Sequence, residues 1–345
     1  MRTQLNERYV KSLEKQQYRF VGNHSAVKIC GWTKSHIRGN GGCYKYKFYG
    51  IRSHQCLQMT TSMYCANRCM FCWRGAKAPV SDKWYGPVDD INDIIKGSIQ
   101  AQMSLLEGFK GSETANKQLI NEMQNVRHVA LSLIGEPVTY PKLNELLDEF
   151  HKRKISTFIV TNGQFPDDIK KLKYVTQFYL SVDAANEKTL KKVDVPLFKD
   201  YYKRLLKSLD IMKKKPFRTC IRITVIKDVN DDDLKGYKEL IERGQPDFIE
   251  VKSYMHVGAS RKFLKRENMP LHSYVVEISK KLNKILPDYE IISEHVPSRV
   301  TCFIRKELKK KQYLNFKKFF EMTDKKQEPI AIKYSSKKMC SNLPN

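Results

Sequence analysis

Short apolar runs alternate with amphipathic segments along most of the chain. Five runs rich in β-branched and aromatic residues have the length and the flanking turns of buried strands. They lie at 128–135, 156–163, 176–184, 218–228 and 247–257. Between them, apolar residues recur every three to four positions, which predicts helices. These helices are expected at 89–108, 141–154, 197–215 and 271–286.

This order predicts a parallel α/β sheet, because alternating strands and helices are joined by crossover connections. The sheet is either open and doubly wound or closed into a (β/α) barrel. In both cases functional side chains are expected at the carboxyl ends of the strands. We divide the chain into an N-terminal extension (1–56), a barrel domain (57–305) and a lysine-rich C-terminal tail (306–345). The extension is predicted to begin with a polar helix up to about residue 20, followed by an irregular glycine-rich stretch.

The composition indicates a globular protein. Of the 345 residues, 41% are hydrophobic, which is enough to bury a core and excludes a disordered class. No apolar stretch is long enough to span a membrane, and the N-terminus lacks the apolar region of an export signal. We therefore expect a cytoplasmic monomer that does not contact a membrane.

The charge indicates a polyanionic partner. The chain has 63 basic and 37 acidic residues, a net charge of +26, and nucleic acid is the commonest polyanion in the cytosol. A lysine-rich composition without a functional meaning is the alternative. In the tail, lysines alternate with aromatic residues, which suits phosphate contacts and base stacking. The other interpretation is a helix whose aromatic side chains pack on the domain. These aromatic residues are Tyr313, Phe316, Phe319, Phe320 and Tyr334.

The cysteines concentrate the candidate chemistry in the first quarter of the chain. Six of nine lie between residues 30 and 72, and in a reducing compartment such clustering indicates metal binding or catalysis. Cys65, Cys69 and Cys72 have the spacing C-x3-C-x2-C, with Phe71 before the third cysteine. Three thiolates can hold a [4Fe–4S] cluster and leave one iron open for a substrate or cofactor. Unrelated buried cysteines are the alternative.

This motif resembles that of the radical S-adenosylmethionine (SAM) superfamily, whose fold is a partial (β/α)6 barrel of the TIM type. The resemblance implies a [4Fe–4S] cluster on these three cysteines and SAM contacts after the next strands. One departure is Ile134, which stands where the superfamily has the first glycine of its glycine-rich motif. The SAM contacts implied are Gly135, Glu136, Pro137, Thr161, Asn162, Ser181 and Asp183.

A second group of cysteines, Cys30, Cys43 and Cys56, has a spacing of thirteen residues each time. From the residues alone, these are scattered structural thiols or part of a zinc site. Such a site would be completed by His24, His36 or His54.

Longer motifs resemble one radical SAM family closely, the tRNA 4-demethylwyosine synthases of wybutosine biosynthesis. The resemblance covers about residues 28–305. The matching segments are CYKYKFYGIRSHQC (43–56), SLIGEPVTYP (132–141), SVDAANEKTLKKV (181–193), EVKSYMHVGASR (250–261) and EHVPSRV (294–300).

The family resemblance implies a carbon–carbon lyase with two [4Fe–4S] clusters, the second on Cys30, Cys43 and Cys56. The implied substrates are pyruvate and N1-methylguanosine at position 37, in the anticodon arm of phenylalanine tRNA. The product is the tricyclic 4-demethylwyosine. Lys45 is implied to form the Schiff base with pyruvate. Lys47 is its rival, because on a strand the two lysines would face the same side.

The resemblance also predicts partners. Eukaryotic members carry a flavodoxin-like domain, whereas only 29 residues precede Cys30 here. We therefore expect a stand-alone form that depends on an external flavodoxin-like or ferredoxin-like electron donor. Candidates for contacts with the substrate or the RNA are Lys47, Arg74, Lys252, His256 and Arg261. The alternatives are another radical SAM enzyme, acting on a different RNA or a peptide, and a zinc-stabilised RNA-binding protein.

Overall fold

Six parallel strands form the centre of a ten-stranded sheet in the computed structural model, which describes residues 5–74 and 78–339. The sheet order is β1-β2-β3-β4-β5-β6-β7-β8-β10-β9, and β3 to β8 pair in parallel. This arrangement confirms the predicted α/β fold with a partial (β/α)6 barrel. The parallel strands are β3 (Cys56–Thr60), β4 (His128–Leu131), β5 (Ser156–Thr161), β6 (Gln177–Ser181), β7 (Arg218–Val225) and β8 (Phe248–Ser253).

Antiparallel strands extend the sheet at both edges. The hairpin β1 (Arg19–Val21) and β2 (Ser25–Val27) pairs with β3, so the N-terminal extension is part of the main sheet. At the other edge β10 (Val300–Arg305) pairs with β8, and β9 (Tyr289–His295) pairs with β10. A short helix, α1 (Glu7–Lys15), precedes the hairpin.

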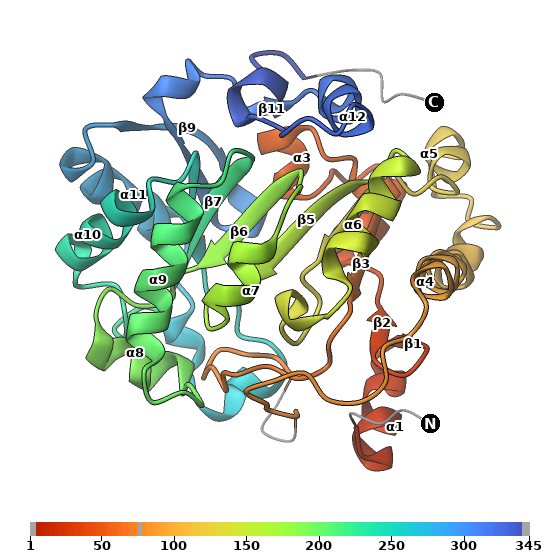
Figure 1. Cartoon of the computed structure of the whole chain (residues 1–345), viewed down its shortest axis with the longest axis horizontal. Coiled ribbons are helices and arrows are strands. Elements are labelled where there is room, and N and C mark those ends of the chain that lie inside the picture. The colour runs from red at the N-terminus through yellow and green to blue at the C-terminus, as the bar shows by residue number, and fades with distance from the viewer. Residues whose placement is uncertain (1–4, 75–77, 340–345) are drawn as a thin grey trace.

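Helices cover the outer face of the curved sheet (Figure 1). Strand alternation directs one set of side chains to this layer, where Ile221 and Ile249 join the main hydrophobic core. None of the helices in the described part of the chain is long and apolar enough to cross a membrane. The helices are α4 (Ile91–Leu106), α5 (Lys117–Glu122), α6 (Leu143–Lys152), α7 (Pro166–Lys171), α8 (Glu187–Asp194), α9 (Tyr201–Lys213), α10 (Leu234–Gly244) and α11 (His272–Ile285).

The inner face of the sheet packs against two segments from opposite ends of the sequence. These are α3 (Tyr44–Tyr49) and the C-terminal α12 (Phe316–Asp324), which lie at the same end of the sheet in Figure 1. The loops that follow β3, drawn in orange, lie at the opposite end. The strand residues Tyr179, Cys220 and Phe248 face this inner core.

The C-terminal segment is anchored by a buried arginine. Arg218 donates hydrogen bonds to Ser335 Oγ and to the Gln312 carbonyl, each at 2.7 Å, and its backbone N–H donates to Tyr334 Oη at 2.7 Å. Tyr334 and three phenylalanines of the tail, Phe316, Phe319 and Phe320, are buried in the inner core. This confirms the packing interpretation of these residues and is inconsistent with stacking on bases.

Residues 44–49 form a helix, so the strand alternation that placed Lys45 and Lys47 on one side is wrong. Gly50 ends the helix with a φ of 81°. Tyr44 and Phe48, four positions apart, are both buried. In a helix, residues two apart point in nearly opposite directions. Lys45 is accordingly half-buried, whereas Lys47 is exposed.

Candidate active site

A cavity of about 340 Å³ opens at the carboxyl ends of the parallel strands. It brings together the cysteines of the loop after β3 and all the predicted SAM contacts except Pro137. The predicted residues that line it are Cys65, Cys69, Cys72, Gly135, Glu136, Thr161, Asn162, Ser181 and Asp183, together with Arg74 and Lys252. The parallel strands thus place residues from six separate parts of the sequence around one space.

Backbone contacts fix the cysteine loop over the barrel. Met70 N–H donates to the Val193 carbonyl at 2.8 Å, and Glu136 N–H donates to the Tyr64 carbonyl at 2.8 Å. Gly135 has a φ of 71°, and a Cβ atom there would lie 1.9 Å from the Ser62 carbonyl oxygen. Only glycine permits this close approach of two backbone segments.

Arg74 stabilises the cysteine loop through a hydrogen bond to its backbone. Its Nη2 donates to the Asn67 carbonyl at 3.0 Å, and Tyr9 of α1 donates to the Arg74 carbonyl at 3.2 Å. The guanidinium is thus held within the loop, and α1 is tied to the cysteine segment.

Glu136 and Asn162 connect neighbouring strand ends to Cys65. Glu136 Oε2 accepts from Asn162 N–H at 3.0 Å, while Asn162 Nδ2 donates to Cys65 Sγ at 3.2 Å. Burial raises the pKa of Glu136 to about 7. An amide that donates to a sulfur favours its thiolate form, as outer hydrogen bonds do at metal sites.

Two buried carboxyl groups, those of Asp183 and Asp194, lie close to the cysteine loop. Asn67 Nδ2 donates to Asp194 Oδ2 at 3.1 Å. Burial raises the pKa of Asp183 to about 6, and burial together with the charge of Asp183 raises that of Asp194. Among the described residues, Asn67 Oδ1 and Asp183 Oδ1 have no hydrogen-bond partner although both are buried. Both residues line the cavity, so these unpaired oxygens belong to its wall.

The loop fits an iron–sulfur cluster with a ligand beside it. Burial raises the pKa of Cys65 to about 11 and that of Cys69 also above its usual range, so a bound cation is required to hold them as thiolates. In the part of the chain that the structure describes, no group of three or more His, Cys, Asp or Glu side chains is spaced for one metal ion. Cluster thiolates each bind a different iron and need not converge in that way.

The second cysteine group lies near the amino ends of the strands. Cys30 precedes α2 (Gly31–Ile37), Cys43 precedes α3, and Cys56 begins β3. Burial raises the pKa of Cys43 and of Cys56 to about 12 each; the charge of Cys30 also raises the pKa of both, and that of Cys43 raises the pKa of Cys56. The three thiols are therefore close enough to interact electrostatically.

The histidines considered for a zinc site make hydrogen bonds elsewhere. His54 Nε2 lies 2.8 Å from Glu122 Oε2, and its Nδ1 lies 3.3 Å from His36 Nδ1. His24 Nδ1 lies 2.7 Å from the Thr61 carbonyl oxygen.

Lys45 projects from α3 into the interior of the barrel. Its Nζ lies 4.3 Å from the centre of the Tyr179 ring and 5.7 Å from that of Phe158. Burial, and next the charge of Arg222, lower the pKa of Lys45. A second amine, Lys252, lines the cavity and donates to the Ser298 carbonyl at 3.3 Å. Burial and Arg222 lower its pKa to about 8.

Two further candidates, His256 and Arg261, lie on the segment after β8, close in sequence to Met255 and Val257, which line the cavity. His256 Nδ1 is 3.1 Å from Tyr254 Oη, and the exposed Arg261 donates to the His256 carbonyl at 3.2 Å. Sequence reasoning missed Trp73, which lines the cavity with 44% of its surface exposed and accepts from Ala259 N–H at 3.3 Å. It also missed Arg222. Trp73 directly follows the cysteine motif, which is the signal that would have identified it.

Family models match almost the whole barrel. The model of the radical SAM superfamily matches residues 59–241, and the model for wyosine base formation matches residues 243–305. The chain belongs to the radical SAM superfamily, and membership implies SAM and one [4Fe–4S] cluster as cofactors.

Curated relatives indicate one family within the superfamily. One from Oryza sativa subsp. japonica, named S-adenosyl-L-methionine-dependent tRNA 4-demethylwyosine synthase, is 48% identical over 289 residues, covering 83% of this chain and 44% of the relative. The corresponding protein TYW1 of Homo sapiens is 44% identical over 300 residues, covering 87% of this chain and 41% of the relative. The chain thus spans less than half the length of these two relatives.

Two solved structures match over nearly their full length. A TYW1 structure described as having a lysine–pyruvate adduct bound has a TM-score of 0.80 and 35% identity, covering 91% of this chain and 99% of its own. A crystal structure of archaeal TYW1 has a TM-score of 0.73 and 32% identity, covering 88% and 97%. Within the superfamily, the chain belongs to the tRNA 4-demethylwyosine synthase family.

Proposed function

We propose that this chain condenses pyruvate with N1-methylguanosine at position 37 of phenylalanine tRNA to form 4-demethylwyosine, as a radical SAM lyase. The observation that carries the proposal is the position of Lys45. Its amine lies inside the barrel, with Cys43 and Cys56 among the charges that act on it. A relative of the same fold is described as holding a lysine–pyruvate adduct, which supports this role.

Cys65, Cys69 and Cys72 would hold the first cluster, and the strand ends that line the cavity would hold SAM beside it. When bound, these cofactors supply the reducing electron and the radical chemistry of the superfamily. The unpartnered Asp183 Oδ1 and Asn67 Oδ1 are acceptors for the hydroxyl or amino groups of such a ligand. Gly135 would let the backbone approach it closely.

Cys30, Cys43 and Cys56 would hold the second cluster. The charge of Cys30 acts on both Cys43 and Cys56, and this proximity supports a common site. Lys45 is two residues from Cys43, which directly precedes the helix that carries the lysine. A keto acid bound at this cluster would therefore meet the lysine amine directly.

The chemistry of Lys45 requires a neutral amine. An amine attacks a ketone only when it is unprotonated, and imine formation then releases water. Burial lowers the lysine pKa, because the charged form loses its hydration. The aromatic faces of Tyr179 and Phe158 supply this environment.

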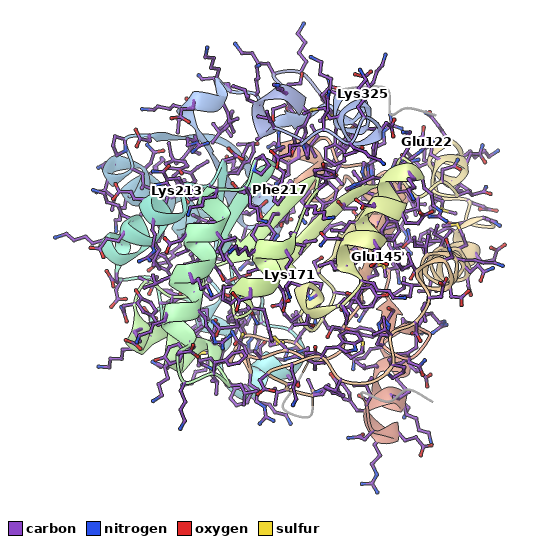
Figure 2. All side chains as sticks on the ribbon, in the orientation of Figure 1. Glu122, Glu145, Lys171, Lys213, Phe217 and Lys325 are labelled. Atoms are coloured by element: carbon purple, nitrogen blue, oxygen red, sulfur yellow. The ribbon has the colours of Figure 1, made fainter. Side chains whose placement is uncertain are left out.

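The RNA would dock on the rim of the cavity. A guanine in a loop must leave its stack to reach the barrel interior. Trp73 and Phe263, with 44% and 56% of their surfaces exposed, provide apolar faces there. Arg261 is exposed near Phe263, and Figure 2 shows long side chains projecting all around the outline of the molecule. Lys47 and His256 remain further candidates for RNA contacts, while Arg74 and Lys252 are oriented inward.

We extend the proposal to the setting of the protein. A cytoplasmic monomer reduced by a separate flavodoxin-like or ferredoxin-like protein fits the composition and the clustered thiols. The division into 1–56, 57–305 and 306–345 is kept as a functional division: second cluster, radical SAM barrel and supporting tail.

The test is a reconstituted reaction under anaerobic conditions with SAM, dithionite, pyruvate and tRNA that carries N1-methylguanosine. We expect 4-demethylwyosine in the nucleoside digest by mass spectrometry, and none when pyruvate is omitted. Formation of 5′-deoxyadenosine without a modified nucleoside would instead support a radical SAM enzyme with another RNA or peptide substrate.

A further inference from the structure

A tyrosine ring lies close to both Lys45 and an arginine that the cysteine motifs do not explain. The centre of the Tyr179 ring is 4.3 Å from Lys45 Nζ and 4.9 Å from Arg222 Cζ. Arg222 lies on β7, and it also lines the cavity that contains Cys65, Cys69 and Cys72. The guanidinium therefore lies at the junction between the proposed pyruvate-binding amine and the main cavity.

Only part of Arg222 is used inside the protein. Its Nε donates to Glu250 Oε2 at 3.1 Å. The same carboxylate accepts from Tyr44 at 3.0 Å and from Tyr49 at 2.9 Å, so its oxygens are already occupied by α3. Among the described residues, the buried Nη2 of Arg222 has no hydrogen-bond partner.

This arrangement is more than a structural ion pair. The Nε contact is sufficient to neutralise the charge of Glu250. It does not explain why a second N–H group of the guanidinium is buried without a partner, because an unpaired buried donor lowers the stability of the fold. Strand alternation directs the Arg222 side chain into the barrel, yet 17% of its surface is still exposed. Its free edge is thus directed toward a place where a ligand can supply the missing acceptor.

We propose that Arg222 binds the carboxylate of the α-keto acid and holds its ketone carbon toward Lys45. A guanidinium and a carboxylate form strong charge-assisted hydrogen bonds with defined geometry. Arg222 would then select keto acids over neutral ketones, while Lys45 reacts with either. This inference rests on the proposed function of Lys45. The methionine part of SAM carries the same chemical group in the same cavity, so the test must separate the two carboxylates.

The experiment compares two carbonyl probes of similar size, pyruvate and hydroxyacetone. Borohydride reduces each imine to a stable amine on the protein, which intact-protein mass spectrometry quantifies. For each probe we measure the concentration at which half of the reconstituted wild-type protein is labelled. We expect this concentration to be at least about tenfold lower for pyruvate than for hydroxyacetone. Arg222→Gln should lose this preference because pyruvate labelling weakens, and Arg222→Lys should retain part of it.

Two further measurements locate the effect. Calorimetric titration with SAM should give the same affinity for Arg222→Gln as for the wild type within about twofold. The matched control is Arg243→Gln on α10, which breaks a surface pair with Asp210 at 2.7 Å and should leave the probe ratio and SAM affinity unchanged.

Two outcomes would overturn the inference. If Arg222→Gln weakens SAM binding but keeps the preference for pyruvate, the guanidinium serves the methionine carboxylate. If both probes lose labelling equally, Arg222 only supports the fold around Glu250. Failure of the proposed function looks different, because labelling would then persist in Lys45→Ala, whatever Arg222→Gln does to the ratio.

Discussion

Asn162 donates a hydrogen bond from Nδ2 to Sγ of Cys65 at 3.2 Å, which links the end of β5 to the first thiol of the motif. Asn162 is also fixed through its backbone N–H, which donates to Glu136 at 3.0 Å. The strand end therefore aims an amide donor at the site where a cluster would bind. Hydrogen bonds to cluster sulfurs raise the reduction potential, because they stabilise the more negative reduced state.

Replacing this amide should make the cluster harder to reduce. For Asn162→Leu we expect full iron content, a more negative reduction potential and SAM cleavage slower by about tenfold to a hundredfold. A redox titration followed by electron paramagnetic resonance measures the potential directly. Asn144→Leu, on α6 far from the loop, is the control. An unchanged potential in Asn162→Leu would show that this hydrogen bond does not tune the cluster.

The two cysteine groups should bind iron independently. Wild-type protein reconstituted without oxygen is expected to contain about eight irons, and Cys69→Ala and Cys43→Ala about four each. Iron and acid-labile sulfide assays measure both. Cys302→Ala, in the inner core outside both groups, should keep about eight. If Cys43→Ala retains the wild-type value, the second cluster and the pyruvate chemistry built on it are incorrect.

Lys45 and Lys47 should differ sharply in pyruvate trapping by borohydride. Lys45→Ala should lose trapping while still cleaving SAM, and Lys47→Ala should trap normally because its side chain is exposed on the other side of α3. A lowered pKa means that Lys45 loses its proton at a lower pH than an ordinary lysine. Trapping should therefore rise with pH and level off below 10.5, the usual lysine value. Trapping that disappears only in Lys47→Ala would transfer the role to that residue.

Gly135 should not tolerate a side chain. In Gly135→Ala the new methyl would meet the backbone of Ser62, which cannot move aside as a flexible side chain would, at a positive φ. We expect a loss of about 2 kcal/mol or more in the free energy of unfolding, together with weakened SAM binding. Urea denaturation and calorimetry measure the two effects. Gly111→Ala, where a Cβ has no heavy atom within 4 Å, should change neither.

Strand order and the first cysteine motif were predictable because both are local patterns. Each of the five predicted strands corresponds to an observed one, and the residues after them line one cavity. The hairpin β1–β2 was missed because strands of three residues are too short to show a period.

The helical conformation of α3 was not predicted, because it depends on contacts with a distant part of the chain. Its aromatic residues favour a strand locally, but Tyr44 and Tyr49 bind Glu250, and this contact determines the conformation. Arg222 was overlooked because its partner Glu250 lies 28 residues further along the chain. Such pairings depend on the register of β7 and β8, which the sequence does not display.

The contact between Tyr44 and Glu250 also has a consequence for biosynthesis. The two residues are separated by 206 positions, so α3 cannot settle until β8 has been made. At bacterial or eukaryotic rates of translation this takes about 10 to 40 s after Tyr44 leaves the ribosome. During that time Cys43 lacks its final surroundings, and the three thiols of the second group are not yet held together. The second cluster that we propose on these cysteines would therefore be inserted only after β8 has been synthesised.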